Sequence, residues 1–289
     1  MQSTNALSLP PAVKDWLANS RYPHILHVFD QACNLINERG EVLSIVTPQI
    51  GNGPFNLVVA ESICFLNHCH PESLISLSPA QFTVGNLIIH TTDVKLWQPR
   101  PDWERFHADK DKIANQITQL QITNYFDHID FVTPFKAHLG LPTTQSLVSN
   151  LCSSLAIADF HFSRMAAQSL AGLGIGLTPS GDDFIMGALY AAWIIHPFET
   201  ANILAKDVAD TAAPRTTSLS AAWLRSAGRG EAGILWHQLL DALICEDHTA
   251  IKESTKNILA VGATSGADAL AGFIDVFGSW IEKAGPCHG

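Results

Sequence analysis

The stretch GLGIGLTPSGDD, at residues 172–183, combines closely spaced glycines with two adjacent carboxylates. Glycines let backbone N–H groups approach a ligand closely, and the start of a following helix adds a partial positive charge, so such a loop suits an anion. However, Asp182 and Asp183 stand where a Walker A loop has its lysine and hydroxyl residue. The dinucleotide-binding pattern also fails, because Leu177 occupies its last glycine position and no clear strand precedes the loop.

Two kinds of ligand remain compatible with this acidic, glycine-rich loop. A divalent cation such as Mg²⁺, held by the aspartates, could bridge the loop to a phosphate. Alternatively, the carboxylates could accept hydrogen bonds from the NH2 group of an amide or carbamoyl compound. Asp182 and Asp183 are therefore candidate catalytic residues in either case, and candidate metal ligands in the first. The candidate ligand-binding residues of the loop are Gly174, Gly176, Thr178, Ser180 and Gly181.

Part of this stretch is repeated later in the chain, because SGDDFIMGAL and SGADALAGFI share the pattern Ser-Gly-x-Asp-x-x-x-Gly (residues 180–189 and 265–274). The pattern predicts a helix start in which Ser180 and Ser265 are the N-caps. Asp183 and Asp268, three residues later, would complete an acidic form of the capping box. Helix capping therefore explains much of the motif without any ligand.

Other positions of the repeat separate a packing role from a functional one. Gly187 and Gly272, four residues after each aspartate, predict a close approach between helices. Asp182 has Ala267 as its counterpart, so capping does not require this second carboxylate. Asp182 and the alternating glycines before it are therefore the part of the loop for which we expect a ligand.

A second polar group of residues lies in RTTSLSAAWLRSAGRGE, which begins at Arg215. Thr216 or Thr217 is expected to cap the helix, and the hydroxyls exceed what one cap requires. A hydroxyl-rich helix start beside an arginine is suited to an oxyanion or phosphate, which makes Arg215, Thr216, Thr217 and Ser218 candidate ligand-binding residues. Arg225 lies among small residues and is predicted to point into a cleft as a catalytic group.

Composition narrows the class of partner. The net charge of −10, without any basic cluster, argues against nucleic acid. Charged residues make up 15% of the chain, against about 25% in typical soluble proteins, which suggests surface buried against other subunits.

We expect a cytoplasmic protein, since the sequence has neither an evident signal peptide nor an apolar run long enough to cross a bilayer. The six cysteines show no disulfide framework and are expected to be reduced.

The pattern of apolar residues predicts two domains of different class. Short apolar runs broken by turn residues, from Glu41 to Trp97, are typical of strands in a small antiparallel barrel or sandwich. A proline-rich segment at 97–103 is followed by helical periodicity. We therefore predict an α+β protein with a β-rich domain at 1–103 and a mainly α-helical domain at 104–289. The later helices are expected at about 182–195, 200–211, 216–227, 231–245, 249–260 and 267–283.

Three motifs in order, GLGIGLTPSGDDFIMGAL, TTSLSAAWLRSAGRGE and VGATSGADALAGFI, resemble the bacterial family typified by the AllH subunit of oxamate carbamoyltransferase. The first half of the chain resembles that family more loosely, through IGNGPFNLVV and VGNLIIHTTDVKLWQP. The resemblance implies carbamoyl transfer between oxalurate and phosphate, giving oxamate and carbamoyl phosphate, in anaerobic use of allantoin nitrogen. It also implies a complex of several different subunits. It supplies no catalytic residues.

The leading hypothesis is therefore a carbamoyltransferase subunit that binds a small anionic or carbamoyl metabolite. In it, the glycine-rich loop and the helix start after Arg215 hold a phosphate or carboxylate. The aspartates orient a carbamoyl NH2 or Mg²⁺, and Arg215 or Arg225 offsets developing negative charge. One rival is a non-catalytic metabolite-binding or assembly subunit. Another is a Mg²⁺-dependent phosphotransferase that uses the aspartates as metal ligands.

Overall fold

A computed structural model describes residues 1–78, 80–122 and 142–284. The chain forms two compact units. The first comprises Met1–Pro99 together with the short segment Ala232–Ile234, and the second comprises Arg100–Glu231 and Leu235–Gly289. No helix among the described residues is sufficiently long and apolar to pass through a membrane.

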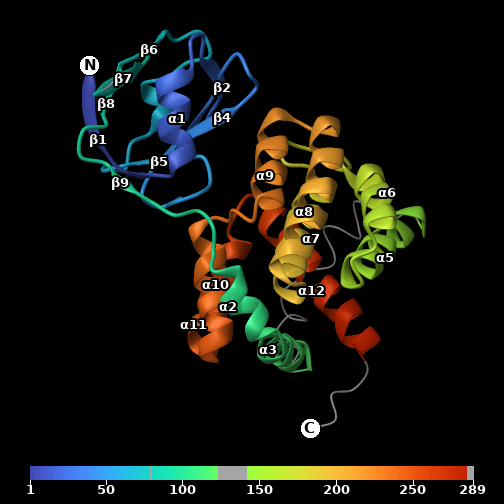
Figure 1. Ribbon diagram of the computed structural model, residues 1–289. Coiled ribbons are helices and arrows are strands. Elements are labelled where there is room, and N and C mark those ends of the chain that lie inside the picture. Colours follow the sequence, from blue (N-terminus) through green and yellow to red (C-terminus); the bar gives the residue numbers. More distant parts are fainter. Residues whose placement is uncertain (79, 123–141, 285–289) are drawn as a thin grey trace. The chain divides into compact units, whose positions relative to one another are not determined.

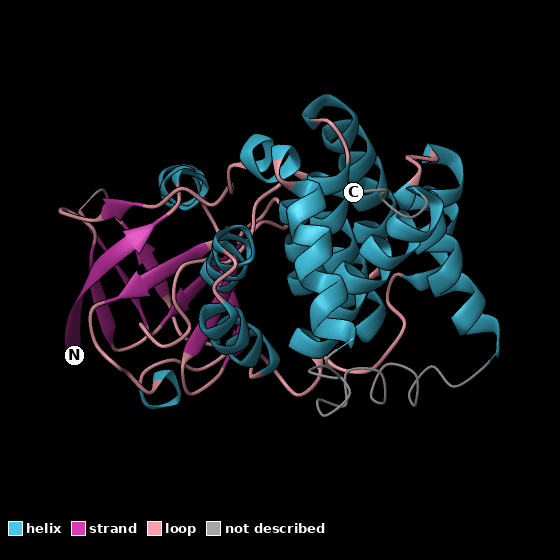
Figure 2. Ribbon diagram, turned by 90° about the horizontal axis from the view of Figure 1, so that it is seen from below, coloured by secondary structure: helices cyan, strands magenta, loops and turns pink. Residues whose placement is uncertain are grey.

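The first unit is a nearly closed β barrel, as predicted. Its strands pair in the order β2-β3-β4-β5-β1-β8-β7-β6, and β9 pairs with β1. Their bounds are β1 Gln2–Leu9, β2 His24–Val28, β3 Ala32–Ile36, β4 Val42–Val46, β5 Asn56–Val59, β6 Ile75–Leu77, β7 Gln81–Val84, β8 Leu87–His90 and β9 Lys95–Leu96. Figure 2 shows these strands as a single group.

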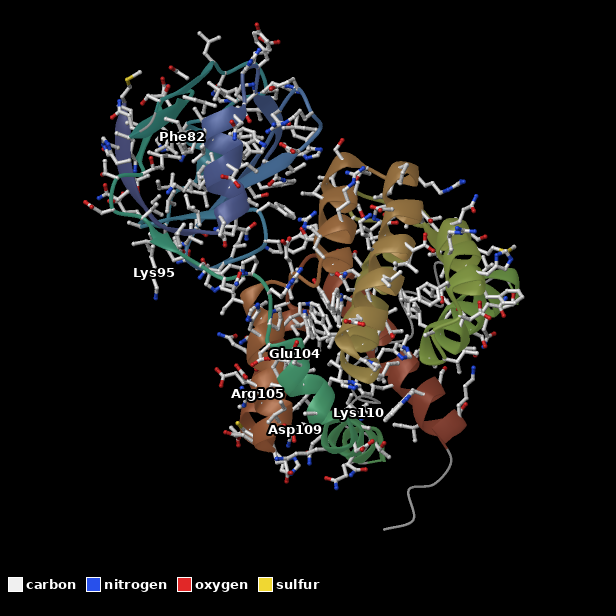
Figure 3. All side chains as sticks on the ribbon, viewed as in Figure 1. Phe82, Lys95, Glu104, Arg105, Asp109 and Lys110 are labelled. Carbon is white, nitrogen blue, oxygen red and sulfur yellow. The ribbon has the colours of Figure 1, made fainter. Side chains whose placement is uncertain are left out.

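Burial explains which residues form the barrel. All residues of β4 and β5 are buried, as expected for strands covered on both faces. Phe82 of β7 lies inside the barrel, whereas Lys95 of β9 extends outwards (Figure 3).

Helix α1 (Pro11–Asn19) has a proline at its first position, where the missing N–H costs nothing. Its Trp16 is buried and donates from Nε1 to the carbonyl of Glu41 at 2.9 Å.

Strand pairing is mixed, a feature that the sequence pattern did not reveal. Three pairs are parallel, namely β4 with β5, β1 with β8, and β1 with β9. Strands β1 to β3 come from the first 36 residues, which belong to the predicted β-rich domain but precede the segment 41–97 whose apolar runs predict strands. Conversely, the run SICFLN, one of the short apolar runs between Glu41 and Trp97 that predict strands, contains a short 3-10 helix, η1 (Phe65–Asn67). Both differences arise because long-range pairing, not local propensity, decides whether a short segment becomes a strand.

The second unit is helical, and the six helices predicted after residue 180 are present with ends shifted by only a few residues. Its helices are α2 Trp103–Ala108, α3 Lys110–Ile122, α5 Pro142–Ala156, α6 Phe160–Leu170, α7 Ser180–Ile195, α8 Phe198–Ala212, α9 Ser218–Gly228, α10 Ile234–Cys245, α11 His248–Leu259 and α12 Ser265–Ala284. The short helix η2 (Ala213–Arg215) precedes α9. Helix α7 is the centre of the unit, because nearly all its residues are buried among α12, α8, α9, α2 and α5.

An aromatic cluster surrounds α7. The rings of Trp103 and Trp193 stack with centroids 5.9 Å apart, and Tyr190 lies 6.2 Å from Trp103. Each polar tip has a partner: Trp193 Nε1 donates to the carbonyl of Ala227 at 2.9 Å, and Trp103 Nε1 to that of Gly230 at 2.8 Å. Buried Trp and Tyr side chains usually require such partners. The cluster therefore fixes the end of α9 against α7.

The two copies of the repeated motif pack against each other, because α7 crosses α12 at the glycines of the repeat. A Cβ atom on Gly187 would lie 1.7 Å from the carbonyl oxygen of Ala269, and one on Gly272 would lie 2.1 Å from that of Phe184. Only glycine fits at either position. The close helix approach that the repeat predicts is therefore present, and each copy serves as the partner of the other.

The predicted N-cap at Ser180 is wrong. Helix α7 begins at Ser180, its N-cap is Pro179, and no side chain caps it. The Asp183 N–H donates to the carbonyl of Pro179 at 3.2 Å, so Asp183 lies in the first turn but does not complete a capping box. The second copy is similar, since α12 begins at Ser265 and the Asp268 N–H donates to the carbonyl of Thr264 at 2.9 Å. The rigid φ of proline fixes the chain direction at the start of α7 without a side-chain cap.

Candidate functional site

The glycine-rich loop joins α6 to α7 and folds back on both helices. The Leu173 N–H donates to the carbonyl of Leu170 at 3.1 Å, and the Gly181 N–H donates to that of Leu173 at 2.8 Å. Gly172, Gly174 and Gly176 have φ angles of 74°, 123° and 98°. These values lie in the left-handed region that glycine adopts most easily. The alternating glycines are therefore required for the path of the loop.

Close approach of backbone to backbone explains most of these glycines. A Cβ atom on Gly172 would lie 2.6 Å from the carbonyl oxygen of Arg215, and one on Gly174 would lie 2.7 Å from the amide nitrogen of Ser180. On Gly181 it would lie 2.1 Å from the carbonyl oxygen of Leu170. Gly176 differs, because nothing lies within 4 Å of its Cβ position. The space beside the other three glycines is thus filled by the protein's own backbone.

Asp182 is the centre of a buried hydrogen-bond network. One carboxylate oxygen, Oδ1, accepts from the Gly172 N–H at 2.8 Å. The other, Oδ2, accepts from the hydroxyl of Ser220 at 2.7 Å and from that of Thr216. The residue is 1% exposed. Asp182 therefore joins three segments, namely the loop, the start of α7 and the start of α9.

Burial and hydrogen bonding act in opposite directions on Asp182. Desolvation by burial raises the pKa of its carboxyl group above the usual value for aspartate. The hydrogen bonds from Thr216, Gly172 and Ser220 favour the charged form and lower the pKa, but they compensate only in part.

Asp183 faces the second copy of the repeat. Its side chain is 4% exposed, and hydroxyl groups of Ser265 and Thr178 bond to it. These two hydroxyl oxygens also lie 2.8 Å from each other. Burial raises the pKa of Asp183 well above its usual value, and the nearby carboxyl groups of Asp268 and Asp182 raise it further. Within the described part of the chain, Asp183 Oδ2 has no hydrogen-bond partner.

The start of α9 is tied to the same loop. Thr217 is the N-cap of α9, and its Oγ1 accepts from the Ser220 N–H at 3.1 Å. The same hydroxyl donates to the carbonyl of Leu177 at 2.5 Å. Between the two threonines named as possible caps, Thr217 caps the helix and Thr216 bonds to Asp182. Arg215 and Ser218 are exposed beside this junction.

The structure brings together most of the candidate residues but not Arg225. The loop residues, the two aspartates and the start of α9 form one region. Arg225 lies in the last turn of α9, about 10 Å along the helix from Ser218, and its side chain is exposed. Sequence reasoning did not name Gly172, Ser220 or Ser265 among the candidate ligand-binding residues. Only the hydroxyl-rich start of α9 signalled one of them, Ser220.

The aspartates do not fit Mg²⁺. Both oxygens of Asp182 already accept hydrogen bonds from protein donors, and Mg²⁺ demands near-octahedral coordination by oxygens. Asp183 has one oxygen without a hydrogen bond, and that oxygen is buried. In the described ranges, no group of three or more His, Cys, Asp or Glu side chains is arranged to hold a metal. We therefore derive no chemistry through a metal ion.

Two family models match the chain. The model described as oxamate carbamoyltransferase subunit AllH matches residues 170–277, and the model of the AllH family N-terminal domain matches residues 5–97. The first match includes the glycine-rich loop, α9 and both copies of the repeat. The second covers most of the barrel. No solved structure matches the chain.

Proposed function

Because the chain belongs to the AllH family, whose name denotes a subunit of oxamate carbamoyltransferase, we propose that it takes part in carbamoyl transfer between oxalurate and phosphate. The reaction would serve the use of allantoin nitrogen in the cytoplasm, within a complex of different subunits. We further propose that the glycine-rich loop and the start of α9 bind an anionic group of the substrate.

The observation that carries the anion site is a set of available backbone donors. Residues Gly174, Ile175 and Gly176 are exposed. Their N–H groups make no hydrogen bond within the described ranges. Leu177, the next residue, is joined to the N-cap of α9 by the hydroxyl of Thr217. The loop amides therefore lie close to the positive end of a helix, an arrangement that favours anions.

Side chains at this junction add charge and hydroxyl groups. Arg215 is exposed, and its backbone contacts Gly172 at the base of the loop. Ser218, the first residue of α9, is also exposed. Oxamate, oxalurate, carbamoyl phosphate and phosphate are all anions, and a guanidinium with oriented amides is suited to phosphate and carboxylate oxygens. Arg215 is consequently the residue that we expect to offset charge on the substrate.

Asp182 has a positioning role in this proposal, since it lies beneath the site and its hydrogen bonds are used internally. It holds the loop through Gly172 and the start of α9 through Thr216 and Ser220. A carbamoyl NH2 could reach its oxygens only by displacing one of these donors. The carboxylate therefore sets the distance between the loop amides and the helix start.

Thermal-shift measurements on the full chain test the anion site. Carbamoyl phosphate, orthophosphate, oxamate and oxalurate are each added to the wild type, to Arg215→Gln and to Arg21→Gln. Arg21 is an exposed arginine of the barrel and serves as the matched control. We expect at least one of these anions to raise the Tm of the wild type and of Arg21→Gln, and the rise to be much smaller in Arg215→Gln. An equal rise in all three proteins would contradict the site.

One structural feature also supports a role in assembly. Ile157, Phe162 and Met165, at the α5–α6 corner, are 57%, 58% and 49% exposed. Exposed apolar groups of this kind often mark contacts with other proteins. A non-catalytic subunit would bind the same anions, but its anion site would take no part in carbamoyl transfer. In the reconstituted complex, Arg215→Gln would then weaken anion binding but leave carbamoyl transfer unchanged, whereas a catalytic subunit would lose transfer.

A further inference from the structure

The barrel is nearly closed, and its gap lies between the two ends of the strand order. Strands β2 and β6 occupy these ends, where β2 pairs with β3 and β6 pairs with β7. Among the described residues, no strand pairing joins β2 to β6. Unpaired edges of this kind are usually covered by another part of the protein. Contacts other than a strand ladder therefore hold the two ends together.

The segment at residues 64–69, which contains η1, makes such contacts. On one side, the Phe65 N–H donates to the carbonyl of Asp30, in the turn between β2 and β3, at 2.9 Å. On the other side, the N–H of Asn86, in the turn between β7 and β8, donates to the carbonyl of His68 at 3.0 Å. The segment thus connects the hairpin at one end of the strand order to a hairpin at the other end.

Two buried thiols meet where this segment ends. Cys69 is its last residue, and Cys33 lies in β3; they are 1% and 0% exposed. The Cys33 thiol is hydrogen-bonded to that of Cys69. Cys69 Sγ in turn donates to the carbonyl of Val84, in β7, at 3.7 Å. Both cysteines are free, so a chain of weak contacts joins β3 to β7 without a covalent bond.

The hydrogen bond makes the two thiols chemically unequal. It lowers the pKa of Cys69 from its usual value, although burial opposes this effect. The same bond raises the pKa of Cys33, and burial and the charge of Cys69 raise it further. The thiolate is the nucleophilic form of cysteine. Cys69 is therefore the thiol that reacts first, with the protonated Cys33 beside it.

We propose that Cys33 and Cys69 form a disulfide when the protein meets a small hydroperoxide, and that this bond closes the gap in the barrel. Burial keeps bulky oxidants away from the pair, whereas hydrogen peroxide is small and uncharged. Disulfides of proteins in a reducing compartment are usually transient and redox-sensing, which fits a pair that is free in the resting protein. The pair lies within the barrel and does not depend on the proposed anion site.

The oxidation takes two steps. First, the Cys69 sulfur attacks one oxygen of hydrogen peroxide, so that an S–O bond forms and the O–O bond breaks; the hydroxide that leaves takes up the proton lost by Cys69 and becomes water. The Cys33 sulfur then attacks the Cys69 sulfenic acid, so that the S–S bond forms and the S–O bond breaks. The hydroxide released takes the Cys33 proton as a second water. Two thiols thus lose two electrons, and the peroxide gains them.

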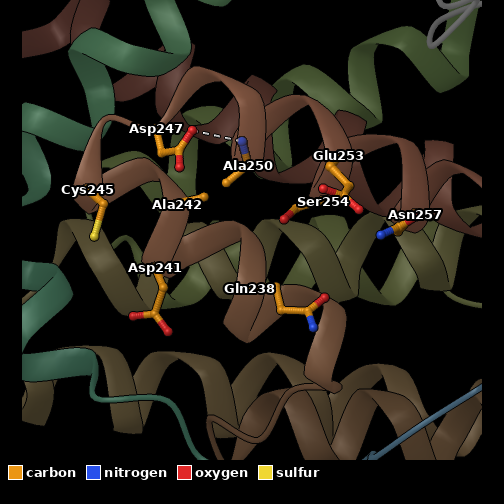
Figure 4. A pocket seen from close by; sticks show the side chains of 9 residues that line it. All are labelled: Gln238, Asp241, Ala242, Cys245, Asp247, Ala250, Glu253, Ser254 and Asn257. Carbon is orange, nitrogen blue, oxygen red and sulfur yellow. Dashed lines mark hydrogen bonds between the residues drawn. The ribbon is translucent and has the colours of Figure 1, made fainter. Parts of the chain in front are cut away.

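Three other cysteines of the described residues provide comparisons. Cys245 is exposed at the end of a hollow between α10 and α11 (Figure 4), and it is the only cysteine among the described residues that line the hollow. Cys64 is partly exposed and donates to Asp30 Oδ1 at 3.5 Å. Cys152 of α5 is buried, and burial raises its pKa well above the usual value. Cys152 is therefore the control for a buried thiol, and Cys245 for an exposed one.

Peptide mapping of the full chain tests the bond. Trypsin leaves Cys33 in the peptide 22–39 and Cys69 in the peptide 40–95. Cys64 would share the second peptide, so the protein carries Cys64→Ser. It is treated with hydrogen peroxide, and its remaining thiols are alkylated after denaturation. We expect mass spectrometry to show the two peptides joined, and a reducing agent to separate them.

Variants in the same background assign the two roles. Cys69→Ser should abolish the joined peptides, and Cys33→Ser should accumulate a sulfenic acid at Cys69 that dimedone traps. Cys152→Ser should leave the joined peptides unchanged. If a variant of the pair fails to fold, the mapping of the protein that retains both thiols still decides whether the bond forms.

Hydrogen exchange tests whether the bond closes the gap. A disulfide restrains the open state, so we expect exchange at the Phe65 and Asn86 amides to be at least about tenfold slower in the oxidised protein. The amides of α7 should not change. The inference is overturned if Cys33 and Cys69 stay reduced at peroxide concentrations that oxidise Cys245. It is also overturned if the oxidised protein exchanges at Phe65 and Asn86 as fast as the reduced one.

Discussion

Replacement of Gly272 by alanine tests the crossing of α7 and α12, on which the candidate site depends. The added Cβ would lie 2.1 Å from the carbonyl oxygen of Phe184, 2.9 Å from its carbonyl carbon and 3.0 Å from the amide nitrogen of Ala188. All three atoms belong to the backbone of α7, so no side-chain rotation can relieve the overlap. The two helices must separate instead.

The cost follows from the depth of this overlap. Real Cβ atoms essentially never approach other atoms closer than 3.0 Å, so α12 must move by roughly 1 Å. Inserting a methyl group into a packed core costs about 1–3 kcal/mol, and a backbone overlap lies at or above the upper end. We expect a loss of about 3 kcal/mol. For a unit of this size, that lowers Tm by about 6–12 °C.

The measurement is the unfolding of the full chain by heat and by urea, with Gly278→Ala as the matched control. Gly278 lies in the same helix, and nothing lies within 4 Å of its Cβ position. Alanine should stabilise α12 there by up to about 1 kcal/mol, because it is the better helix former. If the two variants have equal stability, the helices do not cross as closely as the structure has them, and this reasoning is refuted.

Three further predictions concern the polar network. Asp183 has a raised pKa in the folded state, so it stabilises the fold most below its unfolded pKa of about 3.9, and this contribution is lost as the pH rises through the folded pKa. Asp183→Asn should therefore gain stability relative to the wild type from pH 4 towards pH 8 in urea unfolding, and a pH-independent difference would contradict the assignment. Asp182→Ala leaves three donors without their acceptor and should cost roughly 2–4 kcal/mol in urea unfolding, which Asp182→Asn should partly restore. Thr217→Ala removes the cap of α9 and should cost about 1 kcal/mol, with faster hydrogen exchange at Ser220 as its local sign.

The sequence alone determined the class of each half of the chain and several details of the second. Short apolar runs between turn residues and helical periodicity both reflect local geometry, so the barrel and the later helices could be predicted. The repeated Ser-Gly-x-Asp-x-x-x-Gly motif also predicted close helix packing at Gly187 and Gly272, because a glycine in a helix interior needs such a reason. Thr217 was one of two candidate caps for the same local reason.

Only the tertiary structure decided what the loop glycines and aspartates contact. From the sequence, a glycine that accommodates a ligand looks the same as one that accommodates a neighbouring backbone, and Gly174 proved to lie against Ser180. The pairing of Asp182 with Thr216 and Ser220 joins residues more than thirty positions apart, which no local pattern encodes. Strand pairing in the barrel was hidden for the same reason. Local periodicity indicates the type of the longer elements, whereas the type of short segments and the neighbours of every element depend on long-range packing.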